Sequence, residues 1–295
     1  MLSWAREEAG LSVDGLAEKL SVAPADIALW ESEEAEPSKG QVTKLADALR
    51  RPTAVFFLPS VPLSASVSPR LRSAPGLGGK PLQSGDLRVI RRAQRRQAML
   101  SWCIRDRGDP PVDIPRHEID TDALVAGQDA RQRSGIAVGE QLDWDSDRTA
   151  FRSWRAVLER FGIFVEQSSL GRGGIRGFST WDEYAPLIVV NSAYVPAARS
   201  FTLMHEFGHL LNRGDAACQD FVGSLDDDRV AERWCERFAA AYLVPTEALH
   251  EVAGRTGVTR SAPAARPKEV RQIANRFRVS GRAVFKRARH GDQAY

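Results

Sequence analysis

Residues 201–212, "FTLMHEFGHLLN", place His205 and His209 four positions apart, with Glu206 directly after the first. Apolar residues around the pair indicate a helix, which we expect from about residue 197 to 212. Residues four apart on a helix lie on one face, so both imidazoles can reach a single metal ion. Glu206 would then lie beside a water activated by that metal, where a carboxylate can act as general base.

The alternative is a core helix with two buried histidines that are satisfied by hydrogen bonds and bind no metal. The chain has five histidines, so HExxH arises by chance roughly once in a few hundred such sequences. This rarity and the helical context favour a metal site. Two histidines and a carboxylate favour Zn²⁺, with Mn²⁺ as the alternative.

A zinc site of this kind needs a third protein ligand. Asp215, in "HEFGHLLNRGD", lies where metzincin-like proteases carry theirs. Glu232 and Glu236, in "ERWCERFAAAYLVP" (residues 232–245), are four apart on one expected helical face. There Glu232 would bind the metal, and Glu236 would accept a hydrogen bond from the outer nitrogen of a ligating histidine. A solvated charged face is the other interpretation of this pair.

The surrounding residues 147–250 predict a compact α+β domain. A helix is expected at 147–162, where apolar residues recur at helical spacing and Gly162 ends the pattern. Strands are expected at 163–167, 175–180 and 185–192, the last of them nearly all apolar and β-branched. A second helix is expected at 228–244, ended by Pro245.

Residues 1–58 predict a small all-α helix-turn-helix domain. Ser12 is the expected N-cap of one helix, Pro24 lies in the first turn of the next, and Pro37 and Ser38 open a last one. Residues 59–83 are rich in Pro, Ser and Gly and predict a linker. Residues 84–146 predict an Arg-rich helix from Ser84 to about residue 106 and a connecting segment with short helices.

Charge is spread unevenly along the chain, although its net value is +3. Residues 1–58 carry six Lys or Arg against ten Asp or Glu, whereas 69–107 carry ten against two and 252–295 carry eleven against two. The last stretch belongs to a basic helical segment expected at 251–295. Such asymmetry indicates an anionic partner, nucleic acid first, or contacts between segments. The candidate nucleic-acid contacts are Arg88, Arg91, Arg92, Arg95, Arg96, Arg278 and Arg282.

The expected recognition helix of the first domain is acidic, with Asp26, Glu31 and Glu33. A surface that meets phosphate is usually basic. DNA binding and protein docking therefore both remain open for this domain.

The bulk composition excludes several classes of protein. Three cysteines without CxxC spacing argue against a disulfide framework and a cysteine-rich zinc site. The start of the chain is broken by charges, and no run of 18 apolar residues occurs, so neither a signal peptide nor a membrane span is expected. We expect a cytoplasmic protein; its oligomeric state is not indicated.

The two helical motifs carry a family resemblance. "RSFTLMHEFGHLLN", followed some twenty residues later by "ERWCERFAAAYLVP", resembles the ImmA/IrrE metallopeptidases over about residues 145–247. The N-terminal stretch is similar to an XRE-type helix-turn-helix. The resemblance implies a zincin-like domain of gluzincin type, with His205, His209 and Glu232 as ligands and Glu206 as general base. The family usually has Asn or Asp where this chain has Glu236, so Glu236 is an alternative ligand.

We therefore expect a multi-domain protein in which a zinc-dependent endopeptidase is coupled to transcription regulation. The resemblance implies a repressor-like protein as substrate. The alternative is a DNA-binding transcriptional regulator, or an antitoxin-like protein, whose metal site is structural or silent.

Overall fold

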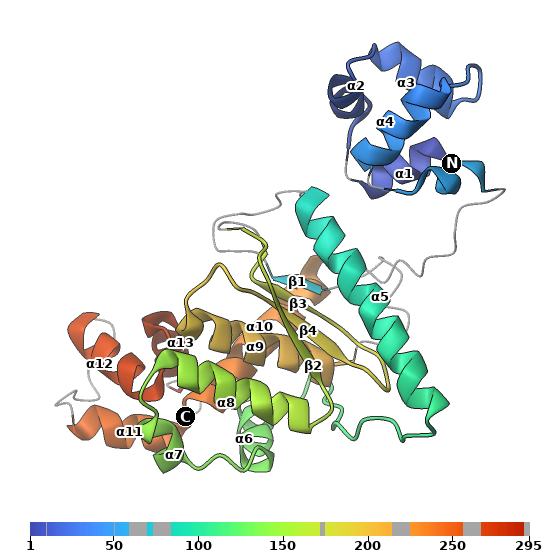
Figure 1. Ribbon diagram of the computed structural model, residues 1–295. Helices are drawn as coiled ribbons and strands as arrows, with labels where there is room; N and C mark the ends of the chain where they lie inside the picture. The colour runs from blue at the N-terminus through green and yellow to red at the C-terminus, as the bar shows by residue number, and fades with distance from the viewer. Residues whose placement is uncertain are drawn as a thin grey trace. The chain divides into compact units, whose positions relative to one another are not determined.

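The computed structural model describes residues 1–9, 11–49, 51–58, 70–72, 84–171, 175–213, 225–255 and 267–291. The chain divides into two compact units (Figure 1). One consists of residues 1–66 and 79–90, the other of 67–78 and 91–295. Each is described by itself.

The N-terminal unit is helical, as predicted. It contains α1 (Leu2–Glu8), α2 (Val13–Leu20), α3 (Pro24–Glu31), α4 (Lys39–Leu49) and the 3₁₀ helix η1 (Thr53–Phe57). The expected N-cap is confirmed, because the Ser12 hydroxyl accepts a hydrogen bond from the Gly15 N–H at 3.0 Å. Pro24 is the first residue of α3, and the α2–α3 pair forms the helix-turn-helix. Leu16, Ile27 and Leu45 lie in its core.

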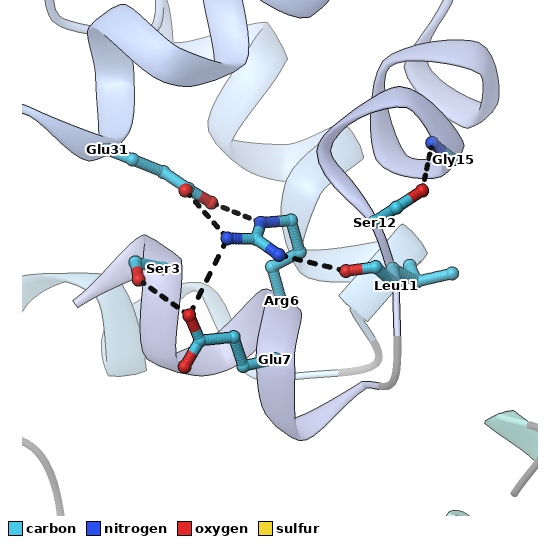
Figure 2. Close-up of polar contacts among 7 residues, drawn as sticks. All are labelled: Ser3, Arg6, Glu7, Leu11, Ser12, Gly15 and Glu31. Atoms are coloured by element: carbon cyan, nitrogen blue, oxygen red, sulfur yellow. Dashed lines mark hydrogen bonds and ion pairs between the residues drawn. The ribbon is translucent and has the colours of Figure 1, made fainter. Parts of the chain in front are cut away.

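An ion pair ties α1 to α3 in this unit (Figure 2). Arg6 donates through Nε and Nη2 to the two carboxylate oxygens of Glu31, at 2.6 and 2.9 Å, and through Nη1 to the Leu11 carbonyl at 3.0 Å. The Arg6 and Glu31 side chains are 12% and 14% exposed. Glu31 is therefore engaged inside the domain and adds little negative charge to the surface of α3.

The second unit contains a four-stranded sheet in the order β1-β3-β4-β2. Its strands are β1 (Arg70–Arg72), β2 (Phe164–Ser168), β3 (Gly177–Thr180) and β4 (Leu187–Asn191). β2 is parallel to β4, whereas β3 is antiparallel to β4 on one side and to β1 on the other. The three predicted strands are confirmed. β1 was not predicted, because its three residues lie in the Pro/Ser/Gly-rich stretch interpreted as linker.

The helices of this unit include the two predicted to carry the site. They are α5 (Ser84–Asp106, of which residues 91–106 belong to this unit), α6 (Ala123–Arg133), α7 (Val138–Asp143), α8 (Asp147–Arg160), α9 (Pro196–Leu211), α10 (Leu225–Leu243), α11 (Thr246–Arg255), α12 (Pro267–Phe277) and α13 (Gly281–Gly291). α9 lies centrally against α8, α10, β3 and β4 (Figure 1). Rings from α8, α9 and α10 pack edge to face or at a tilt in the core there, among them Trp154, Phe207, Phe238 and Tyr242.

Small residues let other helices approach α10 closely. A Cβ added at Gly127 of α6 would lie 2.8 Å from both the Ala241 Cβ and the Phe238 carbonyl oxygen. A Cβ added at Gly208 of α9 would lie 3.3 Å from the Cys235 sulfur. The close approach at Gly208 brings one face of α9 against α10. Within the described residues, no helix combines the length and apolar character that crossing a bilayer requires.

Candidate metal centre

His205 and His209 of α9 converge with Glu232 of α10. The two Nε2 atoms lie 3.1 Å apart. One Glu232 oxygen lies 3.1 Å from the His209 Nε2, and the other lies 3.1 Å from the His205 Nε2. Among the residues that the structure describes, these form the one cluster of three or more His, Cys, Asp or Glu side chains with metal-binding spacing.

The spacing of these atoms fits one tetrahedral metal ion. Ligand bonds of about 2.0–2.1 Å to Zn²⁺ place neighbouring corners of a tetrahedron roughly 3.3 Å apart. The two nitrogens lie 3.1 Å apart, close to that edge, and each has one Glu232 oxygen at the same distance. Three ligating side chains would leave a fourth position open, as catalytic zinc sites require. The residues therefore fit the implied metal.

Two opposing effects act on the pKa of Glu232. Partial burial favours the neutral acid, but hydrogen bonds with His205 and His209, together with their charges, lower the pKa far below its ordinary range. The carboxylate is therefore ionised at neutral pH. An ionised carboxylate is the form that binds a cation.

Glu206 is fully buried next to this cluster. Its Oε2 accepts a hydrogen bond from the Ser179 hydroxyl at 3.0 Å. Gly177 lies on the same face of β3 as Ser179, since a Cβ added at Gly177 would lie 3.6 Å from the Glu206 Cγ. β3 therefore lies directly against the candidate general base. Sequence reasoning missed Ser179; alternation along "GFST" places it on the face of Gly177, but no pattern in the sequence tells which face covers α9.

Three buried side chains hold the carboxyl end of α10. Arg131 donates to the Tyr242 carbonyl at 3.2 Å, Gln141 to the Leu243 carbonyl at 3.0 Å, and Arg287 to the Val244 carbonyl at 3.0 Å. The last carbonyls of a helix lack partners within the helix, so these bonds satisfy groups that would otherwise be unpaired.

The same network joins α6, α7, α12 and α10. Gln141 accepts from Arg131 at 2.7 Å and donates to the Phe277 carbonyl at 2.9 Å. Burial lowers the pKa of Arg131 to about 10, so its guanidinium is still charged at neutral pH. Sequence analysis assigned no role to any of these side chains. The network places part of the segment 251–295 against the helix that carries Glu232.

The two other acidic residues predicted as candidate metal ligands, Glu236 and Asp215, are not part of this cluster as the structure describes it. Glu236 forms an ion pair with Lys286 of α13 and is not a member of the three-residue cluster. Asp215 lies outside the described residues. The predicted hydrogen bond from a ligating histidine to Glu236 stays a prediction.

Several arginines predicted to contact nucleic acid make contacts within the second unit. Arg96 of α5 forms an ion pair with Glu166 of β2 at 2.7 Å, and Arg92 lies 4.0 Å from the same carboxylate. Arg278, which ends α12 with a φ of 55°, donates to the Trp144 carbonyl at 2.9 Å. These side chains therefore have polar partners within the unit.

The remaining arginines of that set lie nearer the surface. Arg88 and Arg95 are exposed, and Arg91 is half-buried. Arg282 is exposed and lines a cavity of about 200 Å³ together with Arg176 and Lys286. The structure does not bring these residues of α5 and α13 into one described contact.

Comparison with known proteins identifies both parts of the chain. Residues 158–289 match the IrrE N-terminal-like domain model of peptidase family M78, and residues 2–56 match a helix-turn-helix family model. Residues 158–289 are thus similar to an IrrE-type peptidase domain, and they follow a stretch that is similar to a helix-turn-helix domain. The predicted resemblance is confirmed, as is the coarse fold of a helical N-terminal domain and a helix-rich second domain with a small sheet.

Two curated relatives are named radiation response metalloprotease IrrE. The protein of Deinococcus radiodurans is 33% identical over 106 residues, which cover 34% of this chain and 29% of that protein. The protein of Deinococcus deserti is 34% identical over 112 residues, 36% of each. The chain thus spans about a third of the length of these relatives.

A solved Mycobacterium tuberculosis transcriptional regulator is also similar. Its TM-score is 0.40 at 17% identity, over 57% of this chain and 46% of that one. That likeness is too low to support an argument about fold or function.

Proposed function

We propose that the chain is a zinc-dependent endopeptidase in which His205, His209 and Glu232 bind the metal and Glu206 is the general base. The observation that carries the proposal is the convergence of three side chains beside the buried Glu206: the two histidine Nε2 atoms lie 3.1 Å apart, and each lies 3.1 Å from a different oxygen of Glu232. Mn²⁺ is the alternative metal. The gluzincin type of the site is part of this proposal.

The chemistry divides between the metal and the chain. A zinc ion held by these residues would supply a Lewis acid that polarises the peptide carbonyl. Glu206 accepts the proton of the attacking water and later donates it to the leaving amine. The Ser179 hydroxyl holds one carboxylate oxygen of Glu206 and so orients the other toward the water. Burial of the α9 face excludes bulk solvent from that proton transfer.

Substitutions separate metal binding from proton transfer. Glu206→Gln should keep zinc and lose cleavage of an identified protein partner. Glu232→Ala should lower zinc occupancy far more than Glu236→Ala or Asp215→Ala. Metal analysis of each purified variant measures this directly. Full cleavage by Glu206→Gln would remove Glu206 from its role, and an empty site in Asp215→Ala would show that the third ligand was assigned wrongly.

We further propose a repressor-like protein as substrate. A helix-turn-helix domain in the same chain supports this proposal, as do relatives named as radiation response metalloproteases. The test is co-expression with helix-turn-helix repressors encoded nearby in the source genome, with intact-mass analysis of fragments. Discrete fragments should appear with the parent chain and be absent with Glu206→Gln. Identical fragments in both would point to another protease.

DNA is the second proposed partner, and the alternative function is a DNA-binding regulator with a structural or silent metal site. The helix-turn-helix match supports DNA binding. The exposed face of α3 limits base-specific contacts, because Ala25, Ala28 and Leu29 lack the paired hydrogen-bonding groups that read base edges and leave only apolar contacts with thymine methyl groups. Duplex binding measured while salt rises decides this: no retention at low salt ends the DNA proposal.

A further inference from the structure

β1 pairs with the outer edge of β3, the strand that lies against Glu206. Arg70, Leu71 and Arg72 lie opposite Ser179, Phe178 and Gly177, in antiparallel register. These three residues precede the peptidase-family match, which begins at residue 158. A segment from outside the matched region therefore completes the sheet beside the proposed active site (Figure 1).

The direction of the β3 backbone groups follows from its pairing with β4. The Asn191 N–H donates to the Arg176 carbonyl at 2.9 Å, in the register that places residue 177 opposite 190. Hydrogen-bonded pairs alternate along an antiparallel ladder. The Phe178 N–H and carbonyl thus turn toward β4, whereas those of Gly177 and Ser179 turn toward β1. Arg70 and Arg72 are the β1 residues whose backbone faces β3.

The two β3 residues that face β1 are also the two that touch Glu206. The Ser179 hydroxyl lies 3.0 Å from the Glu206 carboxylate. A Cβ added at Gly177 would lie 3.6 Å from the Glu206 Cγ. The β1 backbone lies one strand spacing, about 4.8 Å, beyond β3. A peptide on this edge would run directly past the proposed general base.

Extended peptides bind proteins by adding a strand to an open sheet edge. We propose that the Gly177–Ser179 edge is the peptide-binding edge of the peptidase and that residues 70–72 occupy it as an internal competitor. The proposal rests on the proposed function for its catalytic meaning. A substrate would have to offer an extended segment with N–H groups opposite Gly177 and Ser179, and it would bind only in molecules whose edge is open.

The competitor is short enough to be displaced. Its three residues face β3 through the backbone groups of two residues, and one net backbone hydrogen bond changes an equilibrium by roughly five- to tenfold. Apparent affinity for a peptide in trans scales with the fraction of open molecules. Removing one β1 donor should therefore tighten binding of such a peptide about tenfold.

The test uses full-length, zinc-loaded protein carrying Glu206→Gln, so that the probe is not consumed. The probe is a fluorescent peptide of residues 67–74, VSPRLRSA. Arg72→Pro removes the N–H that faces Gly177, and Arg72→Ala is the matched control, which loses the same side chain and keeps the N–H. We expect about tenfold tighter binding with Arg72→Pro and little change with Arg72→Ala. Equal binding by all three proteins, or equal tightening by both variants, overturns the proposal.

Hydrogen exchange verifies that the substitution opens the edge without unfolding the sheet. The Ser179 amide should lose protection in Arg72→Pro, while the Phe178 amide, which faces β4, should keep it. If both amides lose protection, Arg70→Pro, which removes the donor facing Ser179, is measured in the same way. Retained protection of Ser179 in a variant that binds the probe tightly counts against the proposal.

Peptide binding and cleavage of a co-expressed repressor distinguish a failure of this inference from a failure of the proposed function. If Arg72→Pro tightens peptide binding but the parent chain cleaves no co-expressed repressor, the edge assignment stands and the peptidase proposal fails for those substrates. If cleavage occurs and Arg72→Pro leaves both kcat/KM and probe affinity unchanged, the peptidase proposal stands and residues 70–72 are not a competitor.

Discussion

Gln141 provides a direct test of how α10, the helix that carries Glu232, is held. Its side chain is fully buried, accepts from Arg131 at 2.7 Å, and donates to the Leu243 and Phe277 carbonyls at 3.0 and 2.9 Å. Gln141→Met preserves the length and most of the volume of the side chain. It removes all three hydrogen bonds and leaves the Arg131 guanidinium with one polar partner fewer.

The expected loss follows from those three contacts. A hydrogen bond to a charged group contributes about 1.5–3 kcal/mol, and each buried carbonyl left without its donor costs about 1–3 kcal/mol. Carbonyls tolerate a lost donor better than N–H groups do, so we take the lower end for both. The sum is a loss of about 3.5–5 kcal/mol in the free energy of unfolding of the second unit.

Native-state hydrogen exchange of the α10 amides measures this free energy within the full-length protein. Gln132→Met, on the exposed side of α6, is the matched control and should change the value by less than about 0.5 kcal/mol. Zinc affinity extrapolated to the folded state should change little, because Glu232 lies eleven residues from Leu243, about 16 Å along the helix. A loss under 1 kcal/mol for Gln141→Met would refute the argument that these bonds hold α10.

Three further substitutions test other parts of the structure. Arg6→Met should lower the free energy of unfolding of the N-terminal unit by about 2–3 kcal/mol, since the substitution leaves the largely buried Glu31 carboxylate without its bidentate partner. Calorimetry measures this loss, and an unchanged unfolding transition would contradict the prediction. Gly127→Ala should cost about 1–3 kcal/mol, because the new methyl would meet the Phe238 carbonyl at 2.8 Å; a neutral result in urea unfolding would mean that α6 can shift away from α10. Burial raises the pKa of the Tyr242 phenol to about 12, so between pH 10 and pH 12 the folded protein keeps a phenol proton that the unfolded chain loses, and this phenol alone should lower stability over that window by roughly 3 kcal/mol. The lowered pKa of Arg131 acts in the opposite direction over the same window, so the effect is measured as the difference between the parent protein and Tyr242→Phe. Tyr242→Phe should lack the contribution of the phenol, and identical changes of stability with pH in both proteins would contradict the assigned shift.

Much of this fold follows from local sequence patterns. Helical periodicity placed α8 and α9 within a residue or two, and the β-branched run "LIVV" defined β4. The histidine pair and Glu206 were predictable because their spacing within one helix fixes their geometry. The choice of Glu232 as third ligand was harder to predict. A helix pattern shows that Glu232 and Glu236 share a face, but it does not show which of the two turns lies opposite α9.

The features that were missed depend on contacts between distant segments. β1 has three residues, too few for a pattern of alternation, and it exists because β3 offers it an edge. Ser179, Gln141 and Arg131 are polar residues in otherwise ordinary stretches, and their roles follow from carbonyls and a carboxylate supplied by other elements. Residue types alone do not specify such partners.

The basic C-terminal segment shows why an excess of cationic residues does not by itself identify a partner. Its excess of Lys and Arg predicts an anionic partner when read from sequence. In the structure, Arg287 binds the end of α10, Lys286 pairs with Glu236, and Arg278 binds the Trp144 carbonyl. Each of these cations meets a carbonyl or a carboxylate of the same unit. The charge of this segment is therefore explained in part by the need to hold the helix that carries Glu232, and a nucleic-acid role for it has to rest on binding measurements.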